Sequence, residues 1–149
     1  MEQIRVLASI ACDGNRRREL NAIRKTRGFN WGSGAIGCAY WTGVRLCDIL
    51  KKCGVNEKEG RYVWFEGADQ LPQDPYGTSI PLCVAMDPRN DVILAMKMND
   101  ENLSPDHGFP VRVIIPGYVG ARMVKWLKSI RVAIKETLNY YHWHDNKVF

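Results

Sequence analysis

Ala11-Cys12-Asp13-Gly14-Asn15-Arg16-Arg17-Arg18 comes directly after an apolar run, residues 4–10, that is typical of a buried β-strand. A cysteine therefore stands where a strand ends, a Gly-Asn pair turns the chain, and arginines follow at once. A thiolate is a soft metal ligand, and neighbouring cations favour this ionised form. Arginine also binds planar oxyanions in bidentate fashion. The octapeptide therefore predicts a metal ligand and an anion clamp within one turn.

The same octapeptide has a less specific interpretation. A single cysteine at a strand end is often a small buried hydrophobic residue. An arginine triplet is often a solvated surface. Taken alone, the eight residues leave both interpretations open, because short motifs have a high false-positive rate.

The composition is that of one ordinary soluble domain, with 149 residues, 46% of them hydrophobic and 25% charged. Five cysteines without a Cys-x-x-Cys pair argue against a disulfide framework and a zinc ribbon, and favour a reducing, cytoplasmic compartment. We find no signal-peptide pattern and no run long enough to span a membrane. The net charge of +5 suits an anionic substrate, an anionic cofactor or nucleic acid without choosing among them.

Periodicity along the chain predicts an α+β domain of strands, short helices and long loops rich in Gly and Pro. Helices are expected at residues 46–53, ended by Gly54, and at residues 82–86. Residues 18–27 fit a short helix or an ordered loop. Residues 28–37 contain four glycines and form a loop, in which Trp31 either fills the core or lines a pocket. Strands are expected at residues 4–10, 61–65, 92–98, 111–115 and 130–134.

A second cluster of positive charge flanks the expected strand 111–115. Its members are adjacent to Gly or Pro, which lets a backbone approach a ligand closely. They predict a cradle for phosphate or pyrophosphate, against the alternative of scattered surface charge. The cluster consists of His107, Arg112, Arg122 and Lys125. His142-Trp143-His144 suggests zinc less strongly, because no cysteine or carboxylate pair of ligand spacing lies nearby.

Seven motifs occur in order along the chain: Cys12-Asp13-Gly14-Asn15-Arg16-Arg17, Gly28-Phe29-Asn30-Trp31, Phe65-Glu66-Gly67-Ala68, Tyr76-Gly77-Thr78-Ser79-Ile80-Pro81, Ala85-Met86-Asp87-Pro88, Asp106-His107-Gly108-Phe109-Pro110-Val111-Arg112 and Lys125-Trp126-Leu127. Together they resemble the molybdopterin-binding domain of the sulfite oxidase and eukaryotic assimilatory nitrate reductase family. The resemblance runs from about residue 8 to the end of the chain. One departure is Asp13, where many members have Ala.

The resemblance implies a sulfite-oxidase-type α+β fold with mixed β-sheets and short helices, in which residues 1–149 are a partial domain that is incomplete at the N-terminus. It implies that Cys12 is the single protein ligand to molybdenum, that Arg17 faces the substrate oxyanion, and that Trp31 walls the substrate pocket. The residues implied to hold the pterin and its phosphate are Asp69, His107, Arg112, Arg122 and Lys125.

The tail of the chain distinguishes the branches of this family. Sulfite oxidases place a tyrosine beside the metal, and the corresponding position here is Asn146. An amide offers both a donor and an acceptor to nitrate. The resemblance therefore favours molybdenum-dependent reduction of nitrate to nitrite by oxygen-atom transfer, with sulfite oxidation to sulfate as the alternative.

The resemblance also implies parts that this sequence lacks. A full-length enzyme would add an upstream segment, an immunoglobulin-like dimerisation domain that makes it a homodimer, and haem and flavin (FAD) domains that deliver electrons. We expect no nucleic-acid or membrane partner, and weak cofactor binding by the 149-residue chain alone. Two other classes stay open: a basic nucleic-acid-binding module built on residues 16–18, Arg24 and Lys25, and a structural domain that has lost the metal.

Overall fold

Two β-sheets organise the part of the chain that this computed structural model describes, residues 1–56, 58 and 60–145. Every strand pairing within those residues is antiparallel. One sheet has the order β1-β2-β5-β6, with β7 also paired to β5. The other sheet has the order β4-β3-β8. The bounds are β1 Gln3–Ala11, β2 Ile36–Arg45, β3 Tyr62–Gly67, β4 Gly77–Pro81, β5 Ile93–Met98, β6 Glu101–Asn102, β7 Arg112–Ile114 and β8 Leu127–Ala133.

The β1–β2 pair is the frame on which the candidate site is built. The two strands stay in register from Gln3 opposite Val44 to Ala11 opposite Ile36. The indole N–H of Trp41, which is buried, donates to the carbonyl oxygen of Ala8 at 3.2 Å and ties a core side chain to the neighbouring strand. β1 ends at Ala11, directly opposite Ile36, the first residue of β2. The loop that follows β1 and the loop that precedes β2 therefore leave the sheet side by side.

Gly43 marks the point where β2 meets β5. The register shifts between Thr42 and Gly43, as in a β-bulge. A side chain at Gly43 would overlap the carbonyl group of Leu94 on β5. Glycine at this position therefore lets the two backbones approach closely enough to pair.

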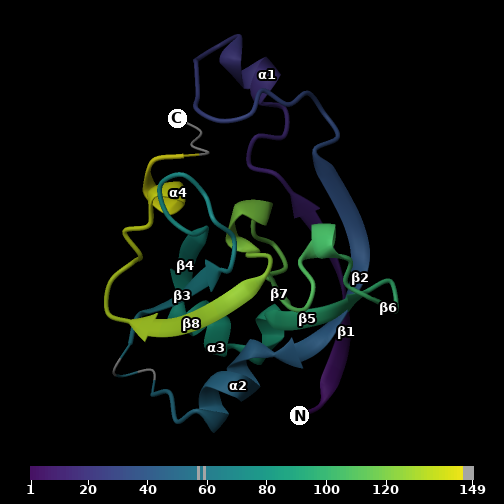
Figure 1. Cartoon of the computed structure of the whole chain (residues 1–149), viewed down its shortest axis with the longest axis vertical. Helices are drawn as coiled ribbons and strands as arrows, with labels where there is room; N and C mark the ends of the chain where they lie inside the picture. Colours follow the sequence, from purple (N-terminus) through teal and green to yellow (C-terminus); the bar gives the residue numbers. More distant parts are fainter. Residues whose placement is uncertain (57, 59, 146–149) are drawn as a thin grey trace.

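Short helices close the ends of both sheets. α2 (Leu46–Lys52) and α3 (Leu82–Met86) pack on each other at the lower end in Figure 1, while α1 (Arg17–Asn21) lies at the opposite end. α4 (Tyr140–Trp143) contacts β4. Three 3₁₀ turns complete the elements: η1 Pro88–Asn90, η2 Pro105–His107 and η3 Gly120–Arg122. Buried side chains from both sheets and from α2 and α3 form one core.

The structure confirms the α+β class and most of the expected elements, with boundary shifts of a few residues. Three strands were not foreseen, β2, β4 and the two-residue β6. The glycine-rich loop ends at Ala35, two residues earlier than expected, because residues 36 and 37 already pair with β1. Residues 42–45 form the end of β2, and the expected helix begins directly after them at Leu46.

Candidate functional site

Cys12 is the first residue after β1, and backbone hydrogen bonds fix its position. Its N–H donates to the carbonyl oxygen of Ala35 at 2.9 Å, and its own carbonyl accepts from the N–H of Asn15 at 2.9 Å. The N–H of Gly14 points at Cys12 Sγ from 3.4 Å. A turn of this kind presents the sulfur on the loop with a backbone donor beside it.

The cysteine loop and the glycine-rich loop are joined by further hydrogen bonds. The N–H of Arg16 donates to the carbonyl of Gly32, and the N–H of Arg18 donates to the carbonyl of Trp31, each at 2.9 Å. Arg16 accordingly adopts a left-handed backbone conformation with φ of 64°. These bonds bring Trp31 next to Cys12, although the two are far apart in the sequence.

Cys12 and Trp31 line the same cavity, which has a volume of about 840 Å³. Among the described residues that line it, the charged ones are Asp13 and Lys125, from opposite halves of the chain. The remaining wall is formed mainly by the glycine-rich loop and by Phe29, Tyr76 and Gly120. This volume lies within the range of small-molecule sites in proteins.

A second cavity of about 310 Å³ adjoins the first. Tyr76, Gly120 and Lys125 line both cavities, so the two lie side by side, and together they are called the cleft below. The second cavity is also lined by Asp69 and Arg112, two of the residues implied to hold the pterin. The structure therefore brings Cys12, Asp69, Arg112 and Lys125 to one cleft.

Arg112 and Asp69 have buried polar atoms that fit an absent ligand. Arg112 donates to the carbonyl oxygens of His107 at 3.0 Å and Met123 at 3.2 Å, and burial lowers its pKa to about 10. Its Nε and Asp69 Oδ1 are buried without an acceptor or donor among the described residues. Buried polar atoms normally have partners, so these two are what a polar cofactor would satisfy.

Gly67 is part of this arrangement. A Cβ on it would overlap Oδ1 of Asp69, so glycine leaves room for that carboxylate. Lys125 completes the wall, and its Nζ donates to the carbonyl oxygen of Asp106 at 2.8 Å. Burial first, and then the charge of Arg112, lower the pKa of Lys125. A donor set of one guanidinium and one ammonium beside a carboxylate suits a pterin that carries a phosphate.

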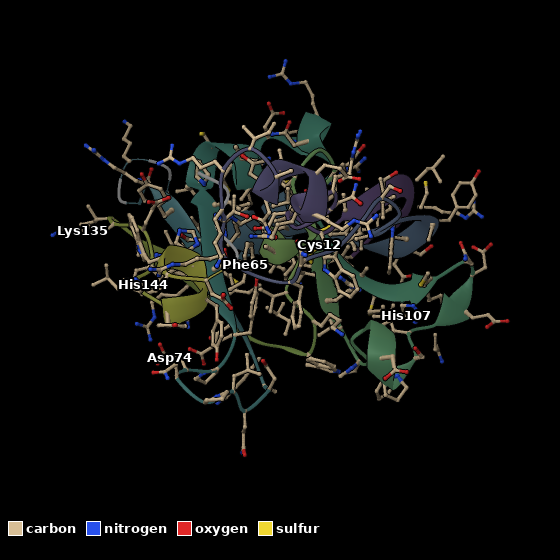
Figure 2. All side chains as sticks on the ribbon, turned by 90° about the horizontal axis from the view of Figure 1, so that it is seen from above. Cys12, Phe65, Asp74, His107, Lys135 and His144 are labelled. Carbon is tan, nitrogen blue, oxygen red and sulfur yellow. The ribbon has the colours of Figure 1, made fainter. Side chains whose placement is uncertain are left out.

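His107 and Arg122 lie at the edges of the cleft. Figure 2 shows His107 well away from Cys12, and its exposed ring bonds Ser104 Oγ at 2.7 Å. Its contribution to the cleft is its carbonyl oxygen, which holds Arg112. Arg122 donates to Thr78 Oγ1 at 3.0 Å and acts electrostatically on Asp13 and Tyr76.

Arg17 lies beneath the wall of the first cavity. Its side chain is fully buried, and Nη1 donates to Thr26 Oγ1 at 3.2 Å. Nη2 is 3.8 Å from Asp13 Oδ1, so the carboxylate of Asp13 lies between Arg17 and the cavity. Burial raises the pKa of Asp13, against the attraction of Arg17. Asn146, implied to contact substrate, lies outside the described residues.

Tyr76 was not assigned a role from the sequence, although it belongs to a quoted motif. Its ring lines both cavities and stacks on Tyr141, with ring centroids 5.7 Å apart. Its hydroxyl donates to the carbonyl oxygen of Ala121 at 2.8 Å. Burial raises the pKa of Tyr76 to about 12. A neutral, fixed phenol therefore stands where the two cavities meet.

Replacing Tyr76 with phenylalanine is expected to destabilise the protein by about 1 kcal/mol near neutral pH, since one hydrogen bond is lost and the packing is kept. The raised pKa of Tyr76 makes its contribution to stability fully present below pH ~10 and lost as the pH rises towards ~12. Tyr76→Phe should therefore lose less stability over that range. Spectrophotometric titration should find one fewer phenol ionising near pH 12, whereas Tyr140→Phe should keep it. An unchanged titration in Tyr76→Phe would contradict the assignment.

His142, in the tail of the chain, is held by contacts within the fold. His142 is buried in α4, and its Nδ1 lies 2.9 Å from Thr78 Oγ1. No group of three or more His, Cys, Asp and Glu side chains that could hold a metal ion occurs in the described part of the chain. None of the helices described is long and apolar enough to cross a membrane.

Comparison with known proteins agrees with this geometry. The family model of the oxidoreductase molybdopterin-binding domain matches residues 1–141. The chain is 57% identical over 145 residues to mitochondrial sulfite oxidase of Drosophila melanogaster, covering 97% of this chain and 25% of that protein. It is 52% identical over 149 residues to nitrate reductase [NADH] 2 of Arabidopsis thaliana, covering 95% of this chain and 16% of that protein.

A further relative and a solved structure agree with the family model. Nitrate reductase [NADPH] of Neurospora crassa is 53% identical over 143 residues, which are 94% of this chain and 15% of that protein. The chain thus spans a quarter or less of the length of these curated relatives. The crystal structure of the sulfane dehydrogenase SoxCD from Paracoccus pantotrophus superposes with a TM-score of 0.82 at 28% identity, over 97% of this chain and 35% of that one.

Two independent lines therefore agree: a cleft that joins a strand-end cysteine to buried cationic groups, and a family model that covers most of the chain. They select an oxidoreductase over a nucleic-acid-binding module. The chain belongs to the oxidoreductase molybdopterin-binding domain family, whose sulfite-oxidase-type fold it shares and whose molybdenum–molybdopterin cofactor it binds.

Proposed function

We propose that this domain is the catalytic part of an assimilatory nitrate reductase, which reduces nitrate to nitrite. The observation that supports an oxygen-transfer site is the position of Cys12 on the wall of a cavity that adjoins the cavity lined by Asp69, Arg112 and Lys125. The choice of nitrate rests on Asn146, which offers a donor and an acceptor to a planar oxyanion.

In this proposal, each residue has a role that its chemistry supports. Cys12 ligates molybdenum through its thiolate, while Asp69, Arg112 and Lys125 hold the pterin and its phosphate. His107 holds Arg112 through its carbonyl oxygen, and Arg122 contributes positive charge from the edge of the cleft. When bound, the cofactor supplies two-electron oxygen-atom transfer.

The protein's own contribution is to attract and position the substrate. Asn146 orients the oxyanion and Arg17 attracts it from behind Asp13, and positioning of this kind lowers the barrier without new bonds to the protein. Trp31 and Phe29, whose ring centroids are 5.7 Å apart, form an apolar part of the cavity wall. The net reaction consumes two electrons and two protons and releases nitrite and water.

The proposal extends to the whole protein. We propose that residues 1–149 are a partial domain, that the full-length enzyme is a cytoplasmic homodimer, and that haem and flavin domains of the same chain supply its electrons. The sulfite oxidase alternative is supported by the 57% identity to the Drosophila melanogaster enzyme.

A side-by-side assay of the complete natural protein tests the substrate. With reduced viologen as donor, nitrite should form from nitrate. With ferricyanide as acceptor, the kcat/KM for sulfite should be at least about tenfold lower than the kcat/KM for nitrate. The reverse order of the two substrates would refute the nitrate proposal in favour of sulfite oxidase. A sample without molybdenum controls for non-enzymatic reduction.

A further inference from the structure

Asp13 lies between Cys12, the proposed metal ligand, and Arg17, the proposed anion clamp. Its Oδ1 is 3.8 Å from Cys12 Sγ and also 3.8 Å from Arg17 Nη2. The carboxylate lines the first cavity, whereas the guanidinium of Arg17 is fully buried behind it. One oxygen atom therefore lies beside both the proposed metal ligand and the proposed anion clamp.

This position places a negative charge next to any oxyanion that uses both groups. An oxyanion that contacts a metal on Cys12 and is attracted by Arg17 must come close to Asp13 Oδ1. The ion pair also offsets much of the positive charge of Arg17 inside the cavity. Of the described residues on the cavity wall, Lys125 carries the remaining positive charge.

The repulsion between Asp13 and a bound anion depends on the charge of the anion. For two anions of the same shape and size, the coulombic cost of a dianion beside a carboxylate is twice that of a monoanion. The side chain of Asp13 is 17% exposed, so the difference is larger there than it would be at an open surface.

We propose that Asp13 is a specificity-determining residue that makes this cavity select monoanionic oxyanions, such as nitrate, over dianionic ones, such as sulfate and sulfite. The inference rests on the proposed function in that it takes the cavity to be the substrate site. It adds a chemical reason for the choice between the two candidate substrates, independent of Asn146.

Perchlorate and sulfate form a matched pair of probes, because both are tetrahedral and they differ in charge. Their dissociation constants for the complete, cofactor-loaded protein can be measured by calorimetric titration at constant pH and ionic strength. Asp13→Asn removes the charge and nearly conserves the shape. We expect it to strengthen sulfate binding about tenfold more than perchlorate binding, which corresponds to about 1.4 kcal/mol.

Two further variants separate charge from structure. Asp13→Glu keeps the charge and should keep the wild-type ratio of the two dissociation constants. Asp100→Asn removes an equal charge from an exposed ion pair with Arg5 and should also leave the ratio unchanged.

A sulfate-to-perchlorate ratio in Asp13→Asn within twofold of the wild-type ratio would overturn the proposal. The titration does not depend on which substrate is turned over. A protein that oxidises sulfite but shows the shifted ratio would refute nitrate reduction and keep the role of Asp13. A protein that reduces nitrate but shows an unchanged sulfate-to-perchlorate ratio in Asp13→Asn would keep nitrate reduction and refute the role of Asp13.

Discussion

In a Cys12→Ser protein, turnover is expected to fall by about 1000-fold or more. Serine presents a harder oxygen that stays protonated near neutral pH, so it cannot replace a soft anionic ligand. The cradle of Asp69, Arg112 and Lys125 is untouched by the change, since it lies in the adjoining cavity. The pterin content, measured by mass spectrometry, should therefore stay close to that of the wild type while activity is lost.

Cys38→Ser is the matched control for this experiment. Cys38 is exposed on β2, opposite Ser9. It is also a free cysteine, but it does not line the cleft. It should keep wild-type turnover and molybdenum content. Activity that survives in Cys12→Ser would exclude ligation by Cys12 and would favour a domain that has kept the fold and lost the metal.

Gly43→Ala should produce a large loss of stability. The added methyl group overlaps the carbonyl of Leu94, which is backbone and cannot rotate away. β2 and β5 would have to separate, and the hydrogen bonds around the bulge would be lost. We expect a decrease in the free energy of unfolding of about 3 kcal/mol or more, measured by denaturant titration. Because domains are stable by only about 5–15 kcal/mol, the soluble yield should fall as well.

Gly37→Ala provides the comparison within the same strand. A Cβ on Gly37 meets no atom within 4 Å, so alanine should be tolerated or should stabilise by about 0.5 kcal/mol through the unfolded chain. Equal losses in the two variants would contradict the argument from close approach, and would mean that glycine matters at both positions for backbone freedom alone.

Local sequence patterns were sufficient to predict some helices and strands and insufficient to predict others. The helix before Gly54 follows from its periodicity, and the strand before Cys12 follows from its apolar run. That strand is not buried as expected: Ala8 is buried, whereas Leu7 is exposed. β2 was missed because Gly37, Cys38 and Gly43 interrupt any alternation in it. Its strand state depends on pairing with β1 and β5, which is a non-local cause.

The sequence predicted which residue types form the candidate site better than it predicted how they are arranged in space. Cys12 and Arg112 stand out by chemistry, and the structure brings both to one cleft. The burial of Arg17 could not be read from a run of three arginines, because it depends on Thr26 and Asp13 folding over it. Tyr76 has no distinguishing local pattern, since its position between the cavities comes from packing on Ala121 and Tyr141.

The bond between His142 and Thr78 has a practical consequence for where this domain can be trimmed. Thr78 Oγ1 is shared by His142 and Arg122, and Glu136 lies 3.8 Å from the other ring nitrogen of His142. An expression boundary placed before α4 would delete one support of a guanidinium at the edge of the cleft. Clones designed for crystallography should therefore extend past residue 143, even though the eight strands are complete by residue 133.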